Sequence, residues 1–183
     1  MMATLVITIV IVGVTMPNND HTIEQIENAI ATCKMTNTYK MAWLRAIIDH
    51  TVENTEDRAI DFDSLATRIF NDYKWKSNAP REGDVNHGSN PATVPGIVQI
   101  VRSVDNPTDK DIKKISSILK KDVAWRFLND VDLYDLDLQA RTITLHDPQL
   151  LRDNAKRLTT ALVKRRACVL NKWNPGLNLV ESK

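Results

Sequence analysis

Hydrophobic residues recur at helical spacing through most of the chain after residue 21. Thr22 and Gln25 form a capping-box pair before a run of isoleucines, which predicts a first short helix. Thr36 or Asn37 is suited to cap a second helix with a broad apolar face, and Asp63 to cap a third. We therefore predict that the first half of the chain forms three helices packed on one another.

The second half begins after residues 74–95, where prolines, glycines and polar residues gather and favour a long surface loop or a seam between subdomains. Pro95 is suited to the first turn of the next helix, and Thr108 with Asp111 forms another capping-box pair. Asp147 before Pro148 is a strong helix-start signal. We predict that one last helix runs from Pro148 to about Trp173, before an Asn-Pro-Gly sequence that ends it.

Two segments depart from helical spacing. Alternating apolar and polar residues on both sides of 139–141 predict one small β-hairpin. Residues 3–14 read ATLVITIVIVGV, a charge-free run about half as long as a membrane-crossing helix needs. This run predicts a strand, or an extension upstream of a start at Met16. A secretory signal is disfavoured, because the basic flank and the small-residue cleavage site are missing.

These patterns predict a mainly α, multi-helix globular protein with one small β-hairpin and, at the N-terminus, a strand as one reading. The predicted organisation has four parts. They are an apolar extension or strand (1–15), an N-terminal helical subdomain (16–76), a loop (77–95) and a C-terminal helical subdomain with the small hairpin (96–183).

Composition narrows the class of protein. The 183 residues are 43% hydrophobic and 26% charged, which suits a folded globular chain. The formal net charge is +1, so any attraction to nucleic acid must come from a local patch. The five glycines form no phosphate-binding loop, and the two cysteines lie too far apart in sequence for a zinc module or a disulfide framework. We expect a cytoplasmic protein with no cofactor, no bound metal and no membrane partner.

The predicted last helix is the most basic segment of the chain. A basic helix face can follow a phosphate backbone without reading the bases, and such binding weakens with salt. The alternative is that these residues are simply solvated and offset acidic segments elsewhere. The lysine-rich segment 110–121 can extend the same patch. The candidate backbone contacts are Lys156, Arg157, Lys164, Arg165 and Arg166.

Other chemistry-bearing residues give weaker patterns. His87, in the Gly/Pro-rich loop, and His146, beside an aspartate, are the two histidines to test, although no histidine has a metal-ligand spacing. Cys168 has two arginine neighbours that can lower the pKa of its thiol, but small buried cysteines are commoner than reactive ones. Asp109, Asp111 and Lys113 are arranged like the D-x-K element of a metal-dependent nuclease. They open a predicted helix rather than lying on a strand, which favours a capping role.

Several short motifs resemble one family. The sequence NTYK at 37–40, followed by Trp43-Leu44 and later by the segments 60–62 and 65–66, is similar to the N-terminal region of bacterial HNH-endonuclease-like proteins. The segment VAWRFL at 123–128 resembles a later element of that region. LNKWNPG at 170–176 resembles the element that closes it before the nuclease begins. The order of these motifs agrees over most of residues 37–183.

The resemblance implies an accessory, non-nuclease region of an HNH-type or restriction-like system, which positions DNA or a partner. The aromatic-proline element expected after the third helix is reduced to Tyr73-Lys74-Trp75, and the His-Asn-His segment is missing from the sequence. We therefore expect no catalytic site in this chain and DNA as its partner. Two alternatives stay open: a protein-interaction or regulatory module that forms an oligomer, and a divalent-metal nuclease that uses Asp109, Asp111 and Lys113.

Overall fold

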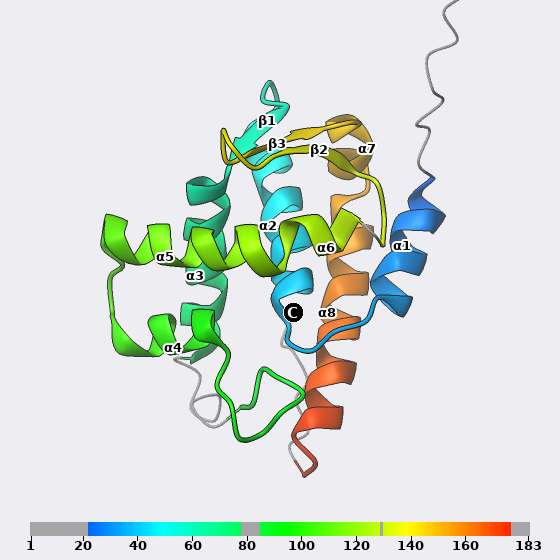
Figure 1. Cartoon of the computed structure of the whole chain (residues 1–183). Helices are drawn as coiled ribbons and strands as arrows, with labels where there is room; N and C mark the ends of the chain where they lie inside the picture. Colours follow the sequence, from blue (N-terminus) through cyan, green and yellow to red (C-terminus); the bar gives the residue numbers. More distant parts are fainter. Residues whose placement is uncertain (1–21, 78–84, 129, 177–183) are drawn as a thin grey trace, which may run out of the picture.

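The computed structural model describes residues 22–77, 85–128 and 130–176, and the apolar run at 1–15 lies outside these ranges. The fold is mainly α with one small antiparallel sheet, as predicted (Figure 1). The helices are α1 (Ile23–Thr32), α2 (Tyr39–Glu53), α3 (Phe62–Ser77), α4 (Gly96–Ser103), α5 (Asp109–Asp122), α6 (Ala124–Leu128), α7 (Pro148–Asp153) and α8 (Ala155–Trp173). The strands are β1 (Ala59–Asp61), β2 (Tyr134–Asp137) and β3 (Thr142–Leu145).

Both predicted capping boxes are confirmed. The Thr22 side chain accepts from the backbone of Gln25, whose side chain accepts in turn from the backbone of Thr22. Thr108 and Asp111 make the same reciprocal pair at the start of α5. These local contacts satisfy amide groups that have no partner within the helix, and they fix where α1 and α5 begin.

The starts of α2 and α3 differ from the prediction by a few residues. Thr38 occupies the N-cap of α2, and its hydroxyl makes no capping bond. The Asn37 side chain accepts instead from the backbone of Tyr39 at 3.0 Å. At α3 the carboxylate of Asp61 accepts from the backbone of Ser64 at 2.8 Å, so Asp61 caps this helix in place of Asp63. In both cases several adjacent residues have suitable side chains, and tertiary contacts decide which one caps the helix.

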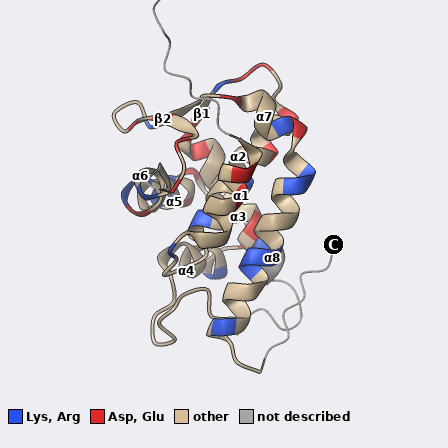
Figure 2. Cartoon of the chain, turned by 90° about the vertical axis from the view of Figure 1, so that its right-hand side faces the viewer, with Lys and Arg blue, Asp and Glu red and all other residues tan. Residues whose placement is uncertain are grey.

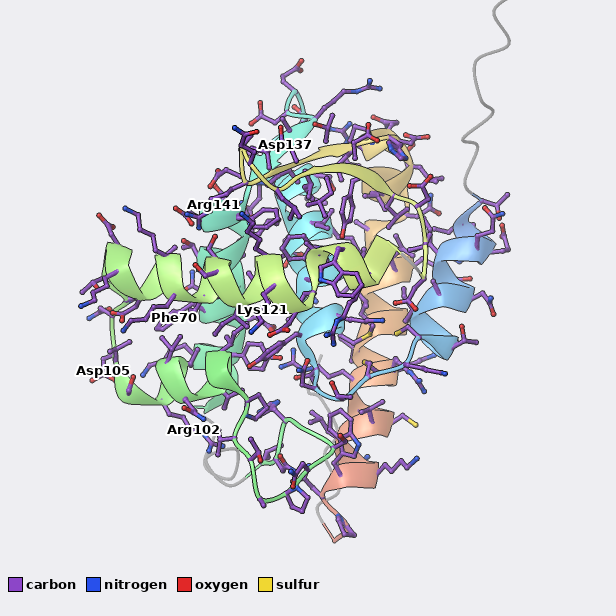
Figure 3. All side chains as sticks on the ribbon, in the orientation of Figure 1. Phe70, Arg102, Asp105, Lys121, Asp137 and Arg141 are labelled. Carbon is purple, nitrogen blue, oxygen red and sulfur yellow. The ribbon has the colours of Figure 1, made fainter. Side chains whose placement is uncertain are left out.

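The predicted hairpin forms between β2 and β3 and turns at Arg141, which has a positive φ of 59°. The sequence prediction missed a third strand, because β1 pairs antiparallel with β3 and gives the order β1-β3-β2. Three residues are too few to show a period-two pattern, so this strand exists only through its pairing. Arg141 also reaches Asp63 on α3 at 3.0 Å and contacts Ser116 on α5 (Figure 3).

The single last helix predicted from Pro148 to Trp173 is wrong in one respect, because the structure divides it at Asn154 into α7 and α8. The Asp147 cap is confirmed, since its carboxylate accepts from the backbone of Leu150 at 2.8 Å. The Asn154 side chain donates to the carbonyl of Leu150 at 2.9 Å. Asparagine side chains compete in this way with the helical backbone, which explains the break.

The core centres on α2, which lies between α8 on one side and α3 on the other (Figure 1). Trp43 is fully buried, and its indole donates to the Tyr134 hydroxyl at 2.9 Å. Tyr134 donates onward to the carbonyl of Ala124 at 2.7 Å, which ties the sheet to α6. Residues from both predicted subdomains enter one hydrophobic cluster. Helix α8 thus packs directly on α2, whereas α5 is joined to α2 through α3.

Candidate nucleic-acid interface

Arg166 does not lie on the surface of α8. Its side chain is only 4% exposed. Its guanidinium lies 4.9 Å from the ring centre of Tyr73 and donates to the carboxylate of Asp72 on α3 at 2.6 Å. A buried guanidinium held in this way cannot reach a phosphate backbone, so the prediction that Arg166 is a backbone contact is wrong. Its place in the helix already pointed inward, because it falls on the same side as Leu162 and Leu170.

Arg157 lies on the surface but is already paired. Its guanidinium donates two hydrogen bonds of 2.7 Å to the carboxylate of Glu27 on α1, and Glu24 lies at 3.6 Å. The bond from Arg157 holds the pKa of Glu27 below its usual range. Fork-shaped pairing of this kind suits arginine and carboxylate geometry. Arg157 therefore joins α8 to α1, and a phosphate would have to compete with Glu27 for it.

The remaining basic residues of α8 also differ in how far they are buried and whether they have a partner. Arg165 is partly buried, and it donates to the carbonyl of Cys33 at 3.4 Å. Lys156 and Lys164 are exposed, as is Lys172 farther along the helix, and no ion pair holds any of the three within the described ranges. Each is eight residues from the next, about 12 Å along a helix. The positive charge of α8 that is available to a ligand therefore comes from three well-separated lysines.

Helix α5 presents a denser basic surface. Its inward side carries Ile115, Ser116 and Leu119, all buried. The opposite side carries the lysines, since residues three, four and seven apart share a helix face. We call this set the α5 lysine face: Lys110, Lys113, Lys114 and Lys121 are exposed, and Lys120, one turn after the buried Ser116, lies partly buried at its margin.

Most of this charge is unpaired. Lys114 lies 3.4 Å from the Asp111 carboxylate, and no ion pair involves the other members among the residues that the structure describes. Side chains on one exposed helix face repel one another when they carry like charges, so a polyanion that neutralises them is favoured.

An exposed aromatic residue continues this surface onto α6. Trp125 is 45% exposed, although it is a large hydrophobic residue. Its indole donates to the carbonyl of Lys121 at 2.7 Å, and the guanidinium of Arg126 lies 5.1 Å from its ring centre. In the sequence, Trp125 belongs to the VAWRFL motif at 123–128. Its position four residues after Lys121 and next to an arginine was the signal that should have marked it.

A shallow groove of about 590 Å³ runs along the contact between α4 and α5. Its floor is mainly apolar and includes Ile100 and Ile118, and Lys110, Lys113 and Lys114 line its edge. Gly96 brings the two helices close, since a β-carbon there would lie 3.2 Å from the end of Ile118. Figure 3 shows Arg102 and Lys121 on these neighbouring helices, α4 and α5.

The two basic helices do not form one continuous patch. Helix α8 packs on α1, α2 and α7, whereas α5 packs on α3, α4 and α6. Figure 2 shows α5 and α6 on one side of α2 and α3, and α8 on the other. The expectation that segment 110–121 extends the α8 patch is therefore wrong. The protein has two separate basic surfaces of different density.

One residue of the proposed D-x-K element, Asp111, is engaged in capping its own helix. The Asp111 carboxylate accepts from the hydroxyl of Thr108 at 2.7 Å, and this bond lowers the pKa of Asp111 from its usual value. Asp109 and Lys113 are exposed residues of the same helix. Within the described ranges, no group of three His, Cys, Asp or Glu side chains is arranged to hold a metal ion.

His87 lies in a buried polar network instead of an open site. Its Nδ1 lies 3.4 Å from the hydroxyl of Thr38, which in turn lies 2.5 Å from the Tyr73 hydroxyl. The His87 carbonyl also accepts from the backbone of Thr38 at 3.2 Å. Burial raises the pKa of Tyr73 to about 12. These contacts fasten the segment after residue 84 to the start of α2, which is a structural role.

The other candidates are one histidine near the hairpin and the two cysteines. His146 Nε2 lies 3.3 Å from Asp135, and its Nδ1 lies 3.2 Å from the carbonyl of Asp132, so this residue after β3 contacts both β2 and the segment before β2. Cys168 is exposed on α8, whereas Cys33 is buried and burial raises the pKa of its thiol. The two cysteines form no disulfide.

No protein-family model matches the chain, and no curated protein or solved structure is significantly similar to it. Among the described helices, none is both long enough and apolar enough to cross a membrane.

Proposed function

We propose that this protein is a non-catalytic, nucleic-acid-associated module that contacts the phosphate backbone through the α5 lysine face. The observation that carries the proposal is the run of lysines on one exposed helix face, beside an exposed tryptophan. Lysines placed in this way bind phosphates through counterion release, without base specificity. The exposed α8 lysines, Lys156 and Lys164, add a weaker second contact on the other side.

The resemblance to the accessory region of HNH-endonuclease-like proteins supports the same role. Such a module holds or positions DNA while another protein or domain cuts it. The nuclease alternative is left out of the proposal, because Asp111 is engaged by Thr108 and Lys114. The oligomer alternative uses either the apolar run at 1–15, which lies outside the described residues, or the helical faces.

The direct test is a fluorescence anisotropy titration of the full chain against labelled duplex and single-stranded DNA, at two salt concentrations, with and without magnesium. We expect binding that weakens as salt rises and no cleavage when magnesium is present. Binding that is absent even at low salt would contradict the proposal. Cleavage that requires magnesium would contradict the non-catalytic part of it.

A charge-reversal variant locates the interface. Lys113→Glu with Lys121→Glu should weaken binding on the order of tenfold and reduce the salt slope by about 1.4 for single strands or 1.8 for duplex, since two phosphate contacts are lost. The same positions changed to glutamine provide a milder control, and urea unfolding of both variants checks that they fold. An unchanged salt slope in a folded variant would remove α5 from the interface.

A further inference from the structure

The exposed Trp125 distinguishes the α5–α6 surface from a purely electrostatic one. Large aromatic side chains are usually buried, and the described part of the core contains Trp43, Phe62, Phe70 and Phe127 with almost no exposure. Trp125 remains 45% exposed beside the α5 lysine face. Its exposure is therefore a feature that a phosphate-binding surface alone does not need.

The orientation of this indole is fixed before any ligand binds. Its Nε1 donates to the carbonyl of Lys121 at 2.7 Å, one turn back along the chain. This bond satisfies the polar atom of the ring, so the ring does not need a hydrogen-bond partner in a ligand. A side chain that is already ordered loses little conformational entropy on binding. Trp125 is thus a preformed flat surface.

Two basic residues are neighbours of Trp125. The Arg126 guanidinium lies 5.1 Å from the ring centre, and Lys121 lies one turn before it on α5. An aromatic ring among cations is the combination that binds single-stranded nucleic acid, where bases stack on the ring and the cations follow the backbone. In a duplex the bases are already stacked on one another and offer only their edges.

We propose that the surface formed by the α5 lysine face, Trp125 and Arg126 binds single-stranded nucleic acid, with one base stacked on the indole of Trp125. This inference rests on the proposed function and narrows its ligand to unpaired strands. The apolar floor of the α4–α5 groove, at Ile100 and Ile118, lies along the same lysines and gives a second place for an unstacked base.

The test compares ligands that carry the same charge with and without bases. The full chain is titrated against a labelled oligothymidylate of about 16 nucleotides, at the upper end of common site sizes, against an abasic phosphodeoxyribose oligomer of equal length and against duplex DNA. Three variants are measured in parallel, namely Trp125→Ala, Trp125→Phe and the control Leu138→Ala. The control removes another exposed apolar side chain, which lies near the hairpin. Urea unfolding confirms that each variant folds.

We expect Trp125→Ala to weaken oligothymidylate binding by about 5- to 100-fold, as removal of a stacking ring does. Trp125→Phe should retain most of the affinity, and Leu138→Ala all of it. The abasic oligomer should bind the wild type weakly, and its affinity should not change in Trp125→Ala.

Several results overturn the inference. They are an equal loss for abasic and base-containing ligands, an affinity for duplex that matches the single strand, or displacement by polyglutamate as effective as by unlabelled oligothymidylate. The last result indicates an acidic protein partner. If the protein binds duplex DNA in a salt-dependent way and the Trp125 variants bind it equally well, only this inference is contradicted. If the protein binds no nucleic acid, the proposed function is contradicted as well.

Discussion

Helices α5 and α8 both carry many basic residues, although α5 also contains three aspartates, and they use this positive charge differently. Two arginines of α8 are already paired with carboxylates of the protein, since the buried Arg166 pairs with Asp72 and the exposed Arg157 with Glu27. Helix α5 carries only lysines as its basic residues, and among the described residues a single ion pair, Lys114 with Asp111, involves them. Helix α8 has the more basic sequence, but it therefore offers less of its positive charge to a ligand than α5 does.

The difference follows from the chemistry of the two cations. Arginine offers a planar fork of donors and is weakly hydrated, which suits it to partly buried pairs between helices. Lysine is a compact and strongly hydrated charge that stays in water. The number of positive residues along a helix does not tell whether they pair within the protein or stay in solvent. The partner of each side chain does tell this.

The largest expected effect is on stability at Arg166. Arg166→Ala leaves the Asp72 carboxylate without its guanidinium and removes the packing on Tyr73, which should lower the free energy of unfolding by about 3 kcal/mol. Urea unfolding measures it, and Lys164→Ala, two residues earlier on the exposed side of α8, is the matched control with a change within about 0.5 kcal/mol. A loss below about 1 kcal/mol in Arg166→Ala would contradict a structural role for this arginine.

The buried ring under Arg166 predicts a loss of stability in alkali. Burial raises the pKa of Tyr73 to about 12, above the value of about 10 expected when unfolded. The folded state thus keeps a proton that the unfolded state releases, so stability is complete below pH 10 and falls as pH rises toward 12.

Tyr73→Phe lacks this proton, and its loss of stability between pH 9 and pH 11 should be smaller than that of the wild type by about 1 kcal/mol. Urea unfolding at the two pH values measures the difference. Equal losses in the two proteins would mean that Tyr73 ionises as readily in the folded state as in the unfolded one.

The smallest effect is expected at the exposed pair that joins α8 to α1. Arg157→Gln should lower stability slightly, and more at low salt than at high salt, because both partners lie near solvent. DNA affinity should not change, since Arg157 is occupied by Glu27. The reciprocal variant, Arg157→Glu with Glu27→Arg, should restore stability. A clear loss of DNA affinity in Arg157→Gln would return this arginine to the binding surface.

Much of the fold was predictable because its signals are local. Capping boxes, the Asp147–Pro148 start and the hairpin turn depend on residues within a few positions of one another. Strand β1 and the break at Asn154 were missed. The first depends on pairing with a strand more than 80 residues away in sequence, and the second on a side chain that competes with its own backbone.

The candidate site was predictable only in part. The α5 lysine face follows from helical spacing alone, and Lys156 and Lys164 are exposed on α8 and stay predicted backbone contacts. The burial of Arg166 depends on Asp72 and Tyr73, which lie far away in sequence and come together only when α3 packs near α8. Tertiary packing decides which charged side chains remain in solvent, and this packing cannot be deduced from local patterns in one sequence.

The most direct test compares the two helices in one assay. Lys113→Glu with Lys121→Glu on α5 and Lys156→Glu with Lys164→Glu on α8 change the net charge equally, so their effects on oligonucleotide affinity and salt slope are directly comparable. We predict that the α5 variant loses on the order of tenfold in affinity, with a reduced slope, and that the α8 variant loses much less. Equal losses, or a larger loss from α8, would contradict the assignment of the binding surface to α5.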